Sequence, residues 1–129
     1  MPKLDAIGIV VRDLGRAREF FRLLGLEFPA PAEGEDHLEA VGPGGIRVML
    51  DTEELVKGFV ENWVEPRGQR VNLAFLCDSP AEVDSLYAKV VAAGFVGKKA
   101  PWDAFWGQRY AQVADAEGGN AVDLFAPLP

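Results

Sequence analysis

The chain repeats one local pattern twice, and this repeat is the feature that most restricts its fold. Residues 4–11 form an apolar run typical of a strand, and Asp13 then opens a segment whose apolar residues recur at helical spacing. Residues 71–77 form a second apolar run. The stretch Ser79-Pro80-Ala81-Glu82 follows it and supplies an N-cap, a first-turn proline and a capping-box glutamate. Each copy therefore predicts a strand followed by an amphipathic helix.

The later part of each copy also repeats. Gly44-Gly45 and Gly118-Gly119 each form a glycine turn that leads into an alternating strand. Further strands are predicted over 37–42, 95–100 and 109–114. The chain thus reads as an α+β protein made of two β-α-β-β-β modules in one domain, 1–129. Module one covers about residues 1–51, a linker helix about 52–69, and module two about 70–129.

Composition excludes several classes of function. The 129 residues include 20 acidic and 13 basic side chains, and the resulting net charge of -7 disfavours binding to nucleic acid and to anionic membranes. The apolar run at the N-terminus is shorter than that of a signal peptide, so a cytoplasmic protein is expected. Cys77 is the single cysteine, and its apolar surroundings predict a buried, inert thiol.

Two segments carry a resemblance to a known family. They are Val11-Arg12-Asp13-Leu14-Gly15-Arg16-Ala17 near the start, and Trp106-Gly107-Gln108-Arg109-Tyr110 followed by residues 115–125 near the end. With the paired modules, they make the chain resemble the vicinal oxygen chelate superfamily of glyoxalases, extradiol dioxygenases and bleomycin-resistance proteins, and most of all the bleomycin-resistance branch. The resemblance implies a curved, partly open mixed sheet around a cleft, with helices on the convex side, and a homodimer.

Strand alternation sorts the residues of such a fold into two sets. The side chains expected to face the cleft are Ala6, Gly8, Val10, Arg47, Met49, Asp51, Asn72, Ala74, Leu76, Ala121, Asp123 and Phe125. Their neighbours, such as Ile9 and Val11, are expected to pack against the helices.

The resemblance also implies that the family's metal site is lost. Metal enzymes of the superfamily use one inward residue from each of four strands, and these positions correspond here to Ala6, Met49, Asn72 and Asp123. One carboxylate and one amide do not hold a divalent ion tightly. The resemblance therefore favours a binding protein with no metal, no cofactor and no catalytic residues over an enzyme.

The stretch 101–110, PWDAFWGQRY, concentrates aromatic residues. Pro101 and Gly107 predict that residues 101–108 form a loop. By the resemblance, Trp106 is the foremost residue to stack on a flat ligand, and Asp103, Asp51, Glu61 and Asp123 provide negative charge. The residues predicted to bind ligand are Trp106, Trp102, Phe105, Tyr110, Asp123, Met49, Arg47, Asn72 and Asp51. The rings alternatively close the end of the sheet or a dimer interface.

The resulting hypothesis is metal-independent binding and sequestration of a small planar compound, cationic or neutral. An alternative is a glyoxalase-type lyase or dioxygenase whose metal site is relocated to His37, Glu39 and Asp123. In that alternative, His37 and Glu39 point the same way because they lie two positions apart on one strand. The other reading of His37 is a surface or hydrogen-bonding role. A third alternative is a catalytically silent partner protein.

Overall fold

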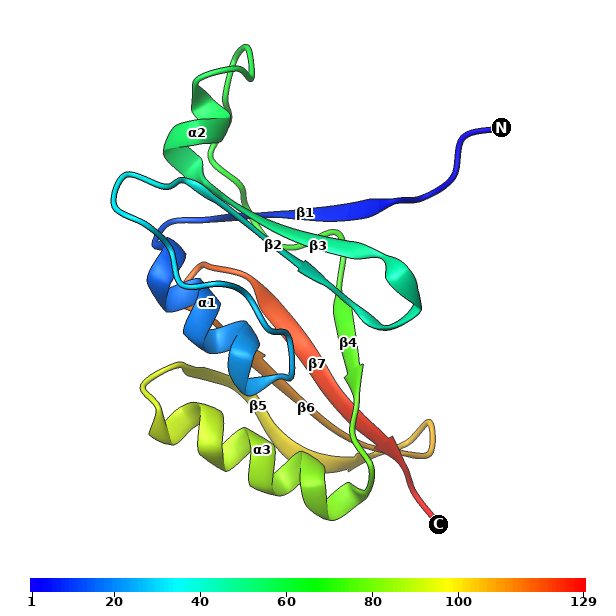
Figure 1. Cartoon of the computed structure of the whole chain (residues 1–129). Helices are drawn as coiled ribbons and strands as arrows, with labels where there is room; N and C mark the ends of the chain where they lie inside the picture. Colours follow the sequence, from blue (N-terminus) through cyan, green and yellow to red (C-terminus); the bar gives the residue numbers. More distant parts are fainter. The chain divides into compact units, whose positions relative to one another are not determined.

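A computed structural model describes all 129 residues of the chain and every side chain except that of Pro43. The chain divides into two compact units, Met1–Glu65 (unit 1) and Pro66–Pro129 (unit 2). Each unit consists of a small mixed sheet and the helices that follow or cover it (Figure 1). No helix in the described chain has the length and apolar character needed to cross a membrane.

Unit 1 contains a three-stranded sheet in the order β1-β3-β2. Its elements along the chain are β1 (Ala6–Val11), α1 (Leu14–Leu23), β2 (His37–Val41), the short 3-10 helix η1 (Pro43–Gly45), β3 (Arg47–Thr52) and α2 (Glu53–Lys57). Strand β1 runs parallel to β3, and β2 runs antiparallel to it. Helix α1 begins after Asp13, whose carboxylate accepts a hydrogen bond from the backbone N–H of Arg16, as the sequence predicts.

Unit 2 contains a four-stranded sheet in the order β4-β7-β6-β5. Its elements are β4 (Leu73–Leu76), α3 (Pro80–Ala92), β5 (Val96–Ala104), β6 (Gln108–Ala114) and β7 (Ala121–Pro127). Helix α3 packs on β5, β6 and β7 (Figure 1). A parallel first strand beside an antiparallel pair occurs in both units, so the predicted α+β class with a duplicated plan is confirmed.

Unit 1 has one strand fewer than the β-α-β-β-β pattern predicts. Residues 26–36, all of which are described, contain no counterpart of β5. Pro29 and Pro31 lie in this stretch, and a proline has no N–H to donate to a strand ladder. A side chain holds the segment instead, because Arg18 Nε donates a hydrogen bond to the carbonyl of Phe28 at 3.0 Å.

The core of each unit lies between its sheet and its helix. In unit 1, Phe20 and Phe21 of α1 are fully buried and pack edge to face at 5.1 Å between ring centroids. In both units, alternate strand residues are buried, and these are Ile9, Val11, Val48, Leu50, Val122, Leu124 and Ala126. Their neighbours along each strand point to the opposite side of the sheet, in the predicted register.

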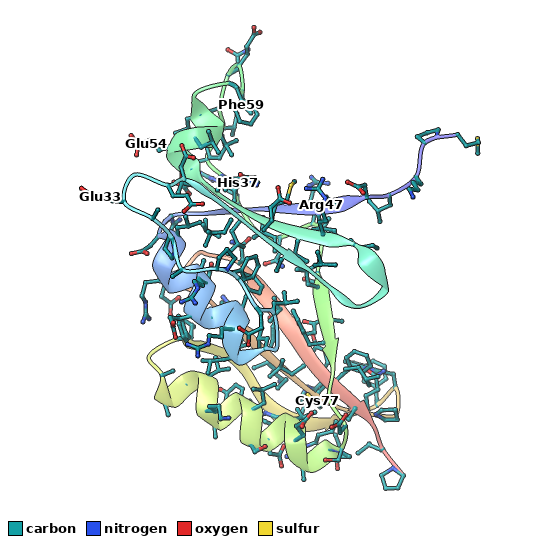
Figure 2. The ribbon with its side chains drawn as sticks, in the orientation of Figure 1. Glu33, His37, Arg47, Glu54, Phe59 and Cys77 are labelled. Atoms are coloured by element: carbon teal, nitrogen blue, oxygen red, sulfur yellow. The ribbon has the colours of Figure 1, made fainter. Side chains whose placement is uncertain are left out.

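The linker helix is shorter than predicted. Helix α2 spans only Glu53–Lys57, and Gly58 follows it directly. Asn62 has a positive φ of 57°, which an α-helix does not contain. Phe59, which lies inside the predicted linker helix 52–69, is 70% exposed and follows the end of α2 (Figure 2). Residues 58–69 therefore do not continue the helix.

The predicted loop over 101–108 is largely strand. Strand β5 continues through Pro101 and Trp102 to Ala104, and only residues 105–107 form the turn into β6. Strand β5 lies at the edge of the sheet, where a missing N–H costs no ladder hydrogen bond. Gly107 closes the turn with a φ of 92°, a conformation that favours glycine.

Candidate functional site

Two rows of side chains cross the face of the unit 2 sheet opposite α3, here called face 2. Strand pairing places one mainly polar row and one mainly aromatic row side by side. The polar row is Lys99, Gln112, Asp123 and Ala74, and the aromatic row is Trp102, Tyr110, Phe125 and Leu76. Face 2 thus brings together Trp102, Tyr110 and Asp123, three of the residues that the sequence predicts to bind ligand.

Only one of the two carboxylate oxygens of Asp123 accepts hydrogen bonds from the described residues. The hydroxyl of Tyr110 and the amide of Gln112 both donate to Asp123 Oδ1, at 2.8 and 3.0 Å. Asp123 Oδ2 has no hydrogen-bond partner among the described residues. Burial, followed by the hydrogen bond to Asp123, raises the pKa of Tyr110 to about 12. Tyr110 is therefore a neutral donor at physiological pH, and its carboxylate partner keeps one oxygen for a ligand.

Four aromatic rings gather where the hairpin turns. Trp106 contacts Trp102, Phe105 and Tyr110 in edge-to-face geometry, with centroid separations of 5.5, 4.9 and 5.3 Å. Its indole N–H donates to Gln108 Oε1 at 2.8 Å. Phe105 is 90% exposed and Trp106 47% exposed. The cluster is therefore anchored through Trp106 and keeps aromatic surface in contact with solvent.

Trp102 has a different environment from Trp106. Its indole N–H is buried and has no hydrogen-bond partner among the described residues. The ammonium of Lys99 lies 5.0 Å from the centroid of its ring. Trp102 is thus held by packing and by a cation–π contact rather than by a hydrogen bond.

The corresponding face of unit 1, opposite α1, carries a chain of ion pairs and is called face 1. Arg47 pairs with Asp5 at 2.7 Å and with Glu39 at 2.6 Å. His37 contacts Glu39 through Nε2 at 2.8 Å and Asp51 through Nδ1 at 2.5 Å. Figure 2 labels His37 and Arg47 in this unit. Face 1 thus contains the predicted residues Arg47 and Asp51, but each is already paired within the protein.

A glycine and a methionine complete face 1. Met49 lies between Arg47 and Asp51 on β3, and its neighbour on β1 is Gly8. A Cβ at Gly8 would lie 3.5 Å from Met49 Cε and 3.9 Å from Asp51 Oδ2, which are ordinary contact distances, so Gly8 lies beside both side chains on face 1. Asn72 is the remaining predicted residue. It precedes β4, is exposed and accepts a hydrogen bond from Gln69 at 3.3 Å.

The residues present do not fit a resident divalent metal. The hydrogen bonds to Asp51 and Glu39 raise the pKa of His37 and favour its doubly protonated ring, which has no lone pair for a metal. Among the described residues, no group of three or more His, Cys, Asp or Glu side chains could hold an ion. Within unit 1, His37 and Glu39 of the alternative metal site are thus engaged in hydrogen bonds with each other and with Asp51.

Nucleophilic chemistry at Cys77 is also disfavoured. Cys77 is buried, and burial together with the nearby charges of Glu82 and Asp78 raises its pKa to about 11. The side chain therefore remains a thiol at physiological pH, and the thiol is a poor nucleophile.

Asp103 does not contribute to face 2. It lies opposite Arg109 in the β5–β6 register, and the Arg109 guanidinium bonds it at 3.1 Å. The same guanidinium holds Asp84 of α3 through two hydrogen bonds, at 2.8 and 3.2 Å. The negative charge of Asp103 is thus paired with Arg109, which also links the β5–β6 hairpin to α3.

Two side chains of face 2 were not predicted. Gln112 lies two positions after Tyr110, so strand alternation alone could have placed it beside Asp123. Lys99 could not be found in this way, because irregular pairing separates it from Trp102.

Comparisons with known proteins agree on one family. A family model described as the glyoxalase/bleomycin resistance protein/dioxygenase superfamily matches residues 3–124. A search of curated proteins gives no match.

Solved structures are similar over nearly the whole chain. A glyoxalase/bleomycin resistance protein/dioxygenase family enzyme from Burkholderia phytofirmans PsJN has a TM-score of 0.81 and 21% identity, covering 98% of this chain and 100% of its own. A glyoxalase/bleomycin resistance protein/dioxygenase from Nocardioides has a TM-score of 0.72 and 26% identity, with coverages of 99% and 85%. A glyoxalase-related enzyme from Fulvimarina pelagi has a TM-score of 0.80 and 17% identity, with coverages of 98% and 88%. With its duplicated plan and the match to the family model, the chain belongs to the glyoxalase/bleomycin resistance protein/dioxygenase superfamily.

Proposed function

We propose that this protein binds a small planar cation on face 2, without a metal, and thereby sequesters it. The observation that carries the proposal is the position of Asp123. Its Oδ1 is fixed by Tyr110 and Gln112, its Oδ2 has no partner among the described residues, and it lies in the row next to Trp102 and Tyr110. An aromatic surface beside a fixed carboxylate suits a flat molecule with a positive group at its edge.

The expected energies are sufficient for useful affinity. An aromatic pair contributes about 0.5–1.5 kcal/mol beyond the area it buries, and a cation–π contact contributes about 0.5–1 kcal/mol at an exposed site. Burial of apolar ligand surface adds about 25 cal/mol per Å². A dissociation constant in the micromolar range corresponds to about 8 kcal/mol, so stacking on two rings with a charge contact and burial can reach it.

Two further observations are compatible with the proposal. The buried Cys77 thiol has a raised pKa, which disfavours it as a nucleophile. The family description and the names of the proteins from Burkholderia phytofirmans and Nocardioides include bleomycin resistance beside glyoxalase and dioxygenase, so sequestration is one of the roles named for the family.

Calorimetric titration with two matched dyes tests the proposal. The probes are 9-aminoacridine, which is cationic at neutral pH, and acridine, which has the same ring system and is mainly neutral. Wild-type protein is expected to bind the cation more tightly. Asp123→Asn should weaken binding of 9-aminoacridine by about tenfold, because a charge-assisted hydrogen bond contributes about 1.5 kcal/mol, and should leave acridine unchanged.

Two further variants make the test specific. Trp106→Ala should weaken binding of both dyes, because it removes a ring that stacks or supports the stack. Asp84→Asn removes an equal charge from α3, on the opposite side of the unit 2 sheet, and should change the affinity for either dye far less than Asp123→Asn changes that for the cation. If neither dye binds wild-type protein, or if Asp84→Asn weakens the cation as much as Asp123→Asn does, the proposed site is wrong.

A further inference from the structure

We propose that Lys99 is a specificity-determining residue of face 2: its ammonium occupies the ring of Trp102 when no ligand is bound, and a cationic ligand must displace it. The inference rests on the proposed function, and it adds that a side chain of the protein itself competes with the cationic ligand. The observation is the ammonium position, 5.0 Å from the centroid of the Trp102 ring. That distance lies within the usual range of a cation–π contact.

The contact depends on an irregularity in β5. In a regular strand, side chains three positions apart point to opposite faces, so Lys99 and Trp102 would be separated by the sheet. Here Lys99 lies opposite Gln112 and Trp102 opposite Tyr110, with shifts in register on both sides of Lys99. The strand therefore has two residues, Ala100 and Pro101, where β6 has one.

The extra residue turns Lys99 to the same face as Trp102. The bulge lies in an edge strand, where the missing N–H of Pro101 leaves no ladder bond unmade. A bulge of this kind re-aims a side chain, and here the re-aimed side chain carries a positive charge. The position of Lys99 on face 2 is thus fixed by the backbone of β5.

A lysine in this position competes with the ligand proposed above. Its ammonium and a planar cation are attracted by the same negative face of Trp102, and both are attracted by the carboxylate of Asp123. When both positive groups are on the face, they repel each other. A ligand gains net affinity only if its rings or its charge interact with face 2 more strongly than the lysine does, so Lys99 selects against small, weakly stacking cations.

The competition predicts a difference between charged and neutral ligands. Removing the ammonium should favour a cation, which then has an unoccupied ring and no repelling neighbour. A neutral ring gains no relief from repulsion. Lys99 therefore affects the preference between 9-aminoacridine and acridine, and an effect on their ratio separates this role from a merely structural one.

The test compares Lys99→Met with Lys98→Met. Both variants remove one positive charge from adjacent exposed positions of β5 and keep a long unbranched side chain, so they change the long-range field equally. Lys99→Met is expected to tighten binding of 9-aminoacridine about two- to fivefold relative to Lys98→Met. Binding of acridine, which gains the unoccupied ring but no relief from charge repulsion, should tighten by less than binding of the cation. Lys99→Arg, which restores a cation, should return the wild-type ratio.

A measurement without ligand checks the contact itself. In 1H–15N spectra, the indole N–H signal of Trp102, assigned through Trp102→Phe, should move in Lys99→Met and stay in place in Lys98→Met. An unmoved signal in both variants overturns the contact.

The two failures can be distinguished. If wild-type protein binds 9-aminoacridine but the two methionine variants bind it equally, the role of Lys99 is wrong and the proposed function stands. If none of the proteins binds either dye, the proposed function fails and the inference fails with it, even where the indole signal moves.

Discussion

At the scale of single residues, His37 connects two acidic side chains of face 1 and so contributes to the stability of the sheet. His37 lies between Glu39 of its own strand and Asp51 of the neighbouring strand, and Arg47 extends the chain of contacts to Asp5. The doubly protonated ring donates to both carboxylates at once, whereas the neutral ring donates to one. The network is therefore strongest when His37 is charged.

This network makes stability depend on pH in a defined direction. The hydrogen bonds raise the pKa of His37 above its ordinary value of 6.5, so its contribution to stability is complete below about pH 6.5 and is lost as pH rises through the pKa of the folded state. Because the ring is 37% exposed, the contribution is expected to be below about 1 kcal/mol.

His37→Gln tests this expectation by chemical denaturation at pH values from about 5 to about 9. The variant should be less stable than wild type at the acidic end and equal to it at the alkaline end. The titration stops at about pH 5 because Glu39 also titrates. The contacts with His37 and Arg47 lower the pKa of Glu39, so its contribution to stability is complete only above its ordinary value of 4.5. A stability difference that does not change with pH would contradict the assignment.

At the scale of elements, the ends of α3 are specified more strongly than those of α2. Ser79 Oγ accepts from the backbone N–H of Glu82 at 3.2 Å, and the Glu82 carboxylate accepts from the N–H of Asp78 at 2.9 Å. Pro80 occupies the first turn, where no N–H is needed. Helix α2 has the Thr52 cap, at 3.1 Å from the N–H of Leu55, but Gly58 ends it after five residues.

Ser79→Ala should lower the free energy of unfolding by about 1 kcal/mol, because the N–H of Glu82 loses its side-chain acceptor and keeps only the carbonyl of Ser79, at 3.1 Å. The matched control is Ser85→Ala in the same helix, where the hydroxyl is exposed and bonds only the carbonyl of Glu82. That change is expected to stay within about 0.5 kcal/mol of wild type. Equal losses in the two variants, measured by urea denaturation, would show that the cap does not stabilise α3 in this way.

At the scale of the whole molecule, the two units share a plan but differ in the chemistry of their faces. The charged side chains of face 1 are paired with one another, whereas face 2 carries aromatic rings and one carboxylate fixed by hydrogen bonds. The net charge of -7 surrounds both units with a negative field. A cationic ligand is therefore attracted over a longer distance than the contacts of face 2 alone provide.

This field predicts a salt dependence. From about 0.01 M to about 1 M salt, the Debye length falls from about 30 Å to about 3 Å, so the attraction of 9-aminoacridine to the protein should weaken steadily. Binding of acridine should change little over the same range. Stopped-flow fluorescence should place most of the loss for the cation in the association rate, and a loss of equal size for the neutral dye would exclude electrostatic steering.

The sequence by itself determined the elements whose signals are local. Asp13 and Ser79 mark the helix starts because a cap depends on residues a few positions away. Strand alternation separated Asp123 and Met49 from the buried residues beside them, because the period of two is a property of the strand itself. The family also followed from sequence, through motifs that span most of the chain.

Only the tertiary structure decided the features that depend on neighbouring strands. Pro101 indicated a loop, but the edge position of β5 makes proline acceptable there, and the same bulge brings Lys99 to Trp102. For His37 the sequence left both hydrogen bonding and metal ligation open, and pairing of β2 with β3 places Asp51 at its second nitrogen as a hydrogen-bond partner. In each case the deciding contact joins residues on different strands or across a bulge, and strand register is set by packing and pairing rather than by local propensity.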